Sequence, residues 1–273
     1  MISGATIVNR IDVVWGFAKT QFQRRLAYPG DFWLAPLARL AIAFALIGFW
    51  SAVFDAGASP GGMTKPMILS WAGAAVVLSR LMEIDLSEDI AERIRRGDIV
   101  FEIMRPFDFQ PQMFGTWLGT TGYSFLIDTL PMSVVLFGIA RVAGPASILV
   151  LGLALVSVLL AMLTAFLLQF TVILIGFWTI QVRTWTWMLA QIVQVASGWF
   201  VPLWLMPDGV REGLQYLPFA MLYHVPLSIF VGRVEGSEAL RMLAIQAAWL
   251  PVLFILSRWM MRQARERVLV QGG

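Results

Sequence analysis

Residues 148–178 have the sequence ILVLGLALVSVLLAMLTAFLLQFTVILIGFW, in which no side chain is charged, and this stretch decides the fold class. At about 1.5 Å per residue, a helix of this length exceeds the roughly 30 Å of hydrocarbon in a bilayer. We therefore predict that these residues cross a membrane as one helix that extends beyond the hydrocarbon.

The composition of the whole chain also indicates a membrane protein. Of its 273 residues, 59% are hydrophobic and 14% are charged, and the mean hydropathy is +0.75. A soluble domain of this size has a smaller fraction of hydrophobic residues and a larger fraction of charged ones. With no cysteine and one histidine, the chain has no thiolate and little imidazole chemistry. We predict no catalytic residue, no metal site and no cofactor, and we attribute the net charge of +3 to membrane topology rather than to nucleic-acid binding.

Five other apolar segments are long enough to be helices, which predicts six transmembrane helices in all. The five are residues 32–54, 66–82, 114–140, 185–204 and 240–261. Pro131 is expected to kink the third of the six. We predict an all-α integral membrane protein in which residues 1–273 form a single transmembrane domain.

Two further segments are expected to be helical without crossing the membrane. Residues 9–28 carry apolar side chains at helical spacing, which predicts an interfacial helix; a soluble amphipathic helix is the alternative. These side chains are Ile11, Trp15, Ala18, Phe22 and Leu26. Residues 206–236 contain an apolar run that is too short to cross and is broken by Pro218 and Pro226. We predict either a re-entrant pair of short helices or an external hairpin there.

The basic residues predict the orientation. Of the 20 lysines and arginines, only five fall in segments assigned to the outer side: Lys65, Arg141, Arg211, Arg233 and Arg241. Because basic residues accumulate in cytoplasmic loops, we expect both termini in the cytoplasm, and we expect no amino-terminal signal peptide.

The segment of residues 83–112 is unusually polar for a loop between two apolar helices. Within it, Ser87 suits the amino-terminal cap of a short helix over residues 88–96, and Gly97 suits its end. Charge pairs four residues apart support this helix, and Leu86, Ile90 and Ile94 form an apolar stripe along it. We predict that the stripe docks against another protein; the alternative is a plain helix that continues toward the third span.

The same segment carries a resemblance to a known family. Ile94, Arg95, Arg96, Gly97 and Asp98, followed by Met104, Arg105, Pro106 and Phe107, resemble the "Ile-x-x-Gly-(Asp/Glu) … Leu-x-Arg-Pro" signature of bacterial type-2 ABC exporter permeases. Met104 stands where leucine is commoner. The resemblance implies that residues 83–112 contain the coupling helix that contacts the ATPase. The residues implied are Leu86, Glu88, Asp89, Ile90, Arg93, Ile94, Arg96, Gly97, Arg105 and Pro106.

The resemblance also implies partners. The chain has no Gly-x-x-x-x-Gly-Lys-(Ser/Thr) loop, so ATP and Mg²⁺ are expected on a separate ABC ATPase subunit. A second permease subunit, identical or a similar paralogue, is expected beside this one in the lipid of the bacterial cytoplasmic membrane. The implied function is ATP-driven export of an amphiphilic or bulky substrate, such as a drug, lipid, glycan or peptide. A non-ABC membrane scaffold and a secondary transporter are the alternatives.

Polar side chains inside the predicted spans are candidates for the translocation pathway. Asp128 is the strongest candidate for a pathway or an interhelical contact, because a carboxylate at membrane depth usually faces protein or water. The alternatives are a displaced span that places Asp128 near the outer interface, and pairing with a neighbouring subunit. Gln191 and Gln194 are weaker candidates, since amides often join helices. For Arg39 we expect a side chain that extends to the headgroups, with a buried ion pair as the alternative.

Overall fold

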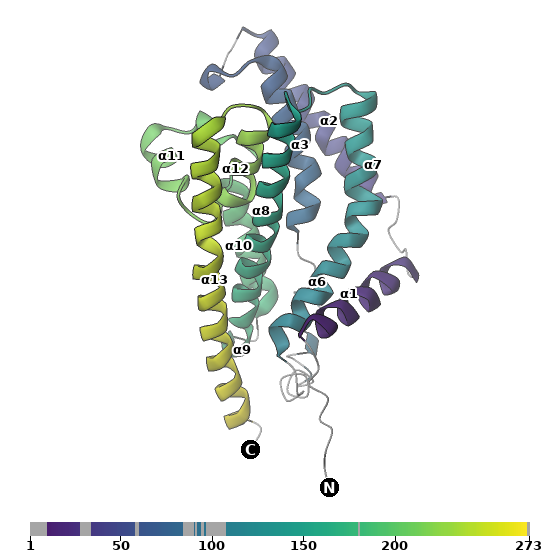
Figure 1. The fold of residues 1–273 in the computed structure, drawn as a ribbon, viewed down its shortest axis with the longest axis vertical. Helices are drawn as coiled ribbons and strands as arrows, with labels where there is room; N and C mark the ends of the chain where they lie inside the picture. The colour runs from purple at the N-terminus through teal and green to yellow at the C-terminus, as the bar shows by residue number, and fades with distance from the viewer. Residues whose placement is uncertain are drawn as a thin grey trace.

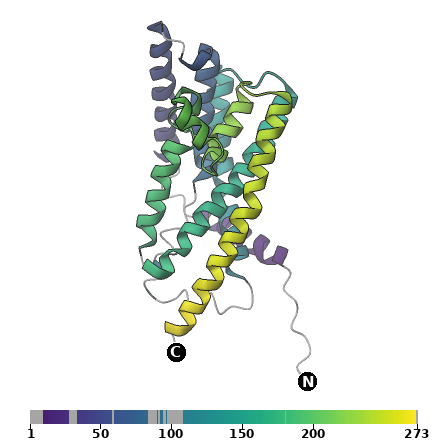
Figure 2. The same cartoon turned by 90° about the vertical axis from the view of Figure 1, so that its left-hand side faces the viewer.

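A computed structural model describes residues 10–27, 34–57, 60–83, 90, 92–93, 96, 108–179 and 181–271. All regular structure in these residues is helical, and they contain no strand. The long helices run along the long axis of the molecule (Figures 1 and 2). They are α2 (Leu34–Asp55), α3 (Lys65–Met82), α6 (Phe109–Ser124), α8 (Ile148–Leu174), α10 (Val182–Ala196) and α13 (Gly236–Gln271).

The described part of the chain starts with α1 (Arg10–Ala27) near the end of the bundle at which α13 ends, at the bottom of Figure 1. We call this the lower end; the opposite, upper end carries α11 (Asp208–Leu214). The short helix α9 (Gly176–Thr179) lies at the lower end, between α8 and α10. The 3-10 turns η1 (Pro60–Gly62) and η4 (Leu203–Leu205) contact each other, and the Arg233 guanidinium donates to the Gly61 carbonyl at 3.2 Å.

Four helical stretches of the described chain are long and apolar enough to cross a membrane: Pro36–Asp55, Phe109–Ile139, Ile148–Thr179 and Gly236–Arg267. They include the first, third, fourth and sixth predicted spans. The second and fifth correspond to α3 and α10, which have 18 and 15 residues, so the count of six stays a prediction. The fifth was predicted to reach residue 204, but α10 ends at Ala196 because Gly198 takes a positive φ of 82°.

The third span contains two π-helical segments, η2 (Phe125–Thr129) and η3 (Val134–Ile139), on either side of the short helix α7 (Leu130–Ser133). Pro131 lies in α7 and has no backbone N–H to donate, so the regular hydrogen-bond ladder cannot continue unchanged through it. π-Helical turns occur often at functional sites, and η2 contains Asp128.

The core is built around α8, against which α10, α12 (Ala220–Phe230) and α13 pack. Gln246 of α13 is completely buried there and all its hydrogen-bonding atoms are used. Its Nε2 donates to the carbonyls of Ser157 and Met221 at 2.9 and 2.8 Å, and its Oε1 accepts from the Ser157 hydroxyl at 2.9 Å. This amide therefore joins α8, α12 and α13.

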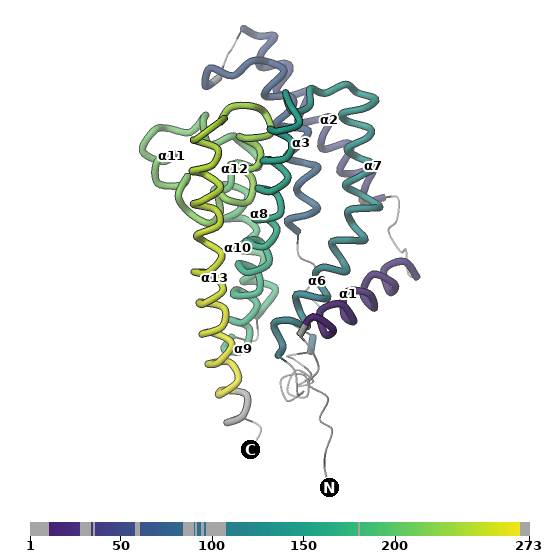
Figure 3. The backbone as a smooth tube through the Cα atoms, viewed as in Figure 1, coloured from purple at the N-terminus to yellow at the C-terminus, as the bar shows by residue number. Residues whose placement is uncertain are grey.

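The segment predicted to be re-entrant contains two helices at the upper end, whose path can be followed in Figure 3. α11 has no buried residue, whereas nearly every side chain of α12 is buried, including His224. The His224 ring lies 5.3 Å from that of Trp204, and its backbone N–H donates to the Ser197 carbonyl. The helical part of the prediction is confirmed, and membrane re-entry stays a prediction.

α1 (Arg10–Ala27) crosses α6 near the lower end (Figure 1). The two backbones approach closely because Gly115 and Gly119 of α6 have no side chains: a Cβ at either position would collide with the carbonyl of Val14 or Ala18. The predicted apolar stripe is therefore divided. Ala18 packs on α6, while Ile11 and Trp15 remain 71% and 68% exposed, as expected of side chains that enter a membrane surface.

Candidate functional site

A network of four charged side chains joins α2, α3 and η2. The guanidinium of Arg80, near the end of α3, donates through Nε to Asp128 Oδ2 at 3.0 Å, and Arg39 Nη1 of α2 lies 3.8 Å from the same oxygen. Glu83 accepts from both arginines, from Arg39 Nη2 at 2.8 Å and from Arg80 Nη1 at 3.0 Å. Two cations and two anions thus balance within one cluster.

Burial makes this balance energetically important. Asp128 is 5% exposed, and a carboxylate removed from water is tolerated only where cations and hydrogen bonds replace its hydration. Its second oxygen, Oδ1, has no hydrogen-bond partner among the described residues. Glu83 lies at the more open edge of the network, with a side chain that is 52% exposed.

The network shows the partners of two of these residues. Arg39 forms an ion pair instead of extending freely to the headgroups, and Asp128 pairs with arginines of the same chain. A pathway role for Asp128 remains a proposal. The signal available from the sequence was that Arg39, Arg80 and Asp128 are among the few charges within the predicted apolar segments, where a charge requires a partner.

A cavity of about 700 Å³ lies beside this network, between α3, the third span, α8 and α12. Leu81 and Thr129, which adjoin Arg80 and Asp128 in the sequence, both line it. Most of its wall is apolar, with Thr121, Thr129 and Ser133 as hydroxyl groups. The volume is within the range of pockets that hold small-molecule ligands.

The predicted coupling residues fall mainly outside the described residues: Leu86, Glu88, Asp89, Ile94, Gly97, Arg105 and Pro106. Of those described, Arg96 forms the expected ion pair with Glu92 four residues earlier, and both side chains are well exposed. Ile90 differs from the prediction. It is 1% exposed and belongs to the main core, because contact with the chain's own helices already removes its apolar surface from water.

The structure does not bring the other pathway candidates to Asp128. Gln191 and Gln194 are exposed on α10, which packs on α8 and α9. Only Val182, Leu189 and Ala196 of α10 are buried, a narrow stripe at spacings of seven residues. Across the described residues, no three histidine or acidic side chains come together as metal ligands.

Residues 40–272 match the profile of the family described as ABC-2 family transporter protein. The match begins at Leu40 within α2 and includes Arg80, Glu83 and Asp128 of the charged network, the predicted coupling segment and α13, whereas Arg39 directly precedes it. A comparison with curated proteins found no match to the chain.

Proposed function

The chain belongs to the ABC-2 transporter family, and we propose that it is the permease of an ATP-driven exporter in a bacterial cytoplasmic membrane. The observation that carries this proposal is the family match over residues 40–272, together with the four apolar stretches long enough to cross a membrane. The substrate would be amphiphilic or bulky, and ATP and Mg²⁺ would bind to a separate ATPase subunit.

In this proposal, the ATPase docks on residues 83–112. The exposed Glu92–Arg96 pair supports a polar contact, in place of the apolar face first predicted with Ile90 at its centre. Charged groups at the edge of an interface mainly set the association rate and the choice of partner.

The charged network offers a physical route from the docking segment to the spans. Glu83 follows α3 directly and is the first residue of the segment, yet it is bonded to Arg39 of α2 and to Arg80 of α3. Arg80 in turn holds Asp128 of η2. A displacement of the segment by the ATPase would therefore act on three membrane helices together, and a balanced ion network of this kind suits exchange between discrete arrangements.

A second permease subunit would complete the pathway. Gln191 and Gln194 lie on the part of α10 that this chain leaves exposed. We propose that this surface faces the second subunit, so that the glutamines of both copies line the substrate route between them.

The proposal is tested by affinity purification of the tagged chain co-expressed with the ABC ATPase encoded nearest to it. We expect the ATPase to co-purify with the unmodified chain. It should no longer co-purify when Arg93 and Arg96 are both replaced by glutamate, because the charges at the contact are then reversed. The matched control is Arg241→Glu, at the opposite end of the bundle on α13. Retention of the ATPase by the double variant contradicts the docking site, and no ATPase with the unmodified chain favours a scaffold or a secondary transporter.

A further inference from the structure

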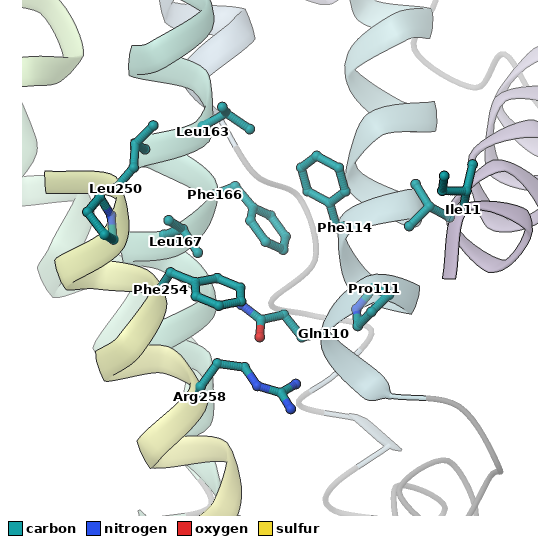
Figure 4. A pocket seen from close by; sticks show the side chains of 12 residues that line it. Ile11, Gln110, Pro111, Phe114, Leu163, Phe166, Leu167, Leu250, Phe254 and Arg258 are labelled. Carbon is teal, nitrogen blue, oxygen red and sulfur yellow. The ribbon is translucent and has the colours of Figure 1, made fainter. Parts of the chain in front are cut away.

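A second cavity, of about 640 Å³, lies near the lower end between α1, α6, α8 and α13. Figure 4 shows its walls, in which Phe114, Phe166 and Phe254 face one another from three helices. Nearly all the lining side chains are apolar, and the cavity is partly open to the surroundings of the bundle. In a membrane-embedded chain those surroundings include lipid, so an acyl chain fits the walls.

The two polar lining residues, Gln110 and Arg258, lie together at the lower side of the cavity (Figure 4). Gln110 is 5% exposed, and its Nε2 donates to the Ser257 hydroxyl at 3.0 Å. Its Oε1 is also buried but accepts no hydrogen bond from the described residues. A buried acceptor without a donor is costly, so this atom points to a ligand that brings a hydroxyl group or a bound water.

The charge beside Gln110 is positive. Arg258 and Arg265 both bind the single carboxylate of Asp108, at 3.4 and 3.0 Å. A guanidinium has five N–H donors, and the Arg258 side chain is 29% exposed, so it retains donors for an anion at the cavity mouth. Arg262 and Arg267 follow on the same helix. Such a basic helix end is typical of the cytoplasmic side, where anionic lipids are found.

We propose that this cavity binds an anionic phospholipid of the surrounding membrane, with one acyl chain among the phenylalanines, the phosphate at Arg258 and a headgroup hydroxyl at Gln110 Oε1. The lipid would link α1 to α13, since Ile11 and Val14 of α1 form one wall and Phe254 forms the opposite one. The proposal goes beyond the transport function and does not depend on it, because such a lipid would occupy the site in the resting protein.

The test is native mass spectrometry of the full-length chain, delipidated in detergent and titrated with dioleoylphosphatidylglycerol or dioleoylphosphatidylcholine. We expect tighter binding of phosphatidylglycerol. Arg258→Gln should weaken it roughly tenfold, the size of one charge-assisted hydrogen bond. It should weaken phosphatidylcholine binding less, because the quaternary ammonium of that lipid offsets the attraction between its phosphate and the arginine. Arg262→Gln is the matched control, because this exposed arginine follows one turn later and does not line the cavity.

A second variant keeps the proposal falsifiable if Arg258→Gln disturbs folding. Leu163→Trp fills the cavity from α8 without changing any charge, and it should reduce the binding of phosphatidylglycerol. Equal affinity for the two lipids overturns the proposal, as does an equal loss in the Arg258 and Arg262 variants. Unchanged binding by Leu163→Trp shows that the lipid binds elsewhere.

Discussion

Replacement of Asp128 by asparagine tests the charged network most directly. The change preserves shape but leaves Arg39 and Arg80 facing a neutral amide at the site where they now share a buried carboxylate. Removing one partner of a buried ion pair typically costs about 3–5 kcal/mol. We expect about 3 kcal/mol of lost unfolding free energy, the lower end of that range, because Glu83 still binds both arginines.

Glu83→Gln is the internal control. The Glu83 side chain is 52% exposed, so water replaces its lost interactions, and the cost should stay below about 1 kcal/mol, as for surface pairs. Arg80→Gln should resemble Asp128→Asn, since it leaves Asp128 buried with only the more distant Arg39. The variant that combines Asp128→Asn with Arg80→Gln should lose about 2 kcal/mol less unfolding free energy than the sum of the two single variants. The reason is that the second change removes a charge that is already unpaired.

The free energies are measured by titrating the purified chain from detergent into SDS, with unfolding followed by the fluorescence of its 12 tryptophans. Asp128→Asn and Arg80→Gln then form a double-mutant cycle. If Asp128→Asn costs no more than Glu83→Gln, or if the two single losses add in the double variant, Asp128 is not held by Arg80 and the network cannot transmit movement from Glu83.

Two further predictions concern the packing that supports the site. Gly115→Leu should separate α1 from α6, because the new side chain collides with the Val14 carbonyl. Gly122→Ala is the control, because its new methyl group meets only a distant side-chain carbon. In limited proteolysis, the protection of α1 should fall in the first variant and not in the second. Gln246→Leu should lower the unfolding free energy by about 1–3 kcal/mol because it leaves buried groups unpaired. In the same SDS titration, Gln194→Leu on the exposed surface of α10 should change the unfolding free energy by less than about 0.5 kcal/mol. Equal losses in the Gln246 and Gln194 variants would contradict the buried role of Gln246.

The membrane class and the long spans could be predicted because a long uninterrupted apolar segment has few stable structures other than a transmembrane helix. The ends of the helices were harder to predict. Residues after Ala196 remain largely apolar, so composition does not indicate that α10 stops there; the positive φ of Gly198 does. α12 is also apolar but short, and its burial depends on the space left between α3, α8 and α13.

The candidate site could be predicted only in part, because pairing depends on how deep each helix lies. Asp128 was identifiable as a costly charge, but its partners are 48 and 89 positions away in the sequence, on α3 and α2. They meet it because Arg80, near the lower end of α3, lies level with η2 in the middle of the third span. Ile90 shows the reverse case: its helical spacing favoured an outward-facing stripe, while the neighbouring helices supplied a closer apolar contact.

The sequence alone determined that this protein is an α-helical membrane protein with a polar segment between two apolar helices. Hydrophobicity and helical spacing are local properties, and the cost of exposing backbone groups to lipid permits few alternatives. Only the tertiary structure decided which charges neutralise Asp128, which face of α1 meets α6 and where the two cavities form. These features depend on the relative depth and close approach of helices, which are set by packing between residues far apart in the chain.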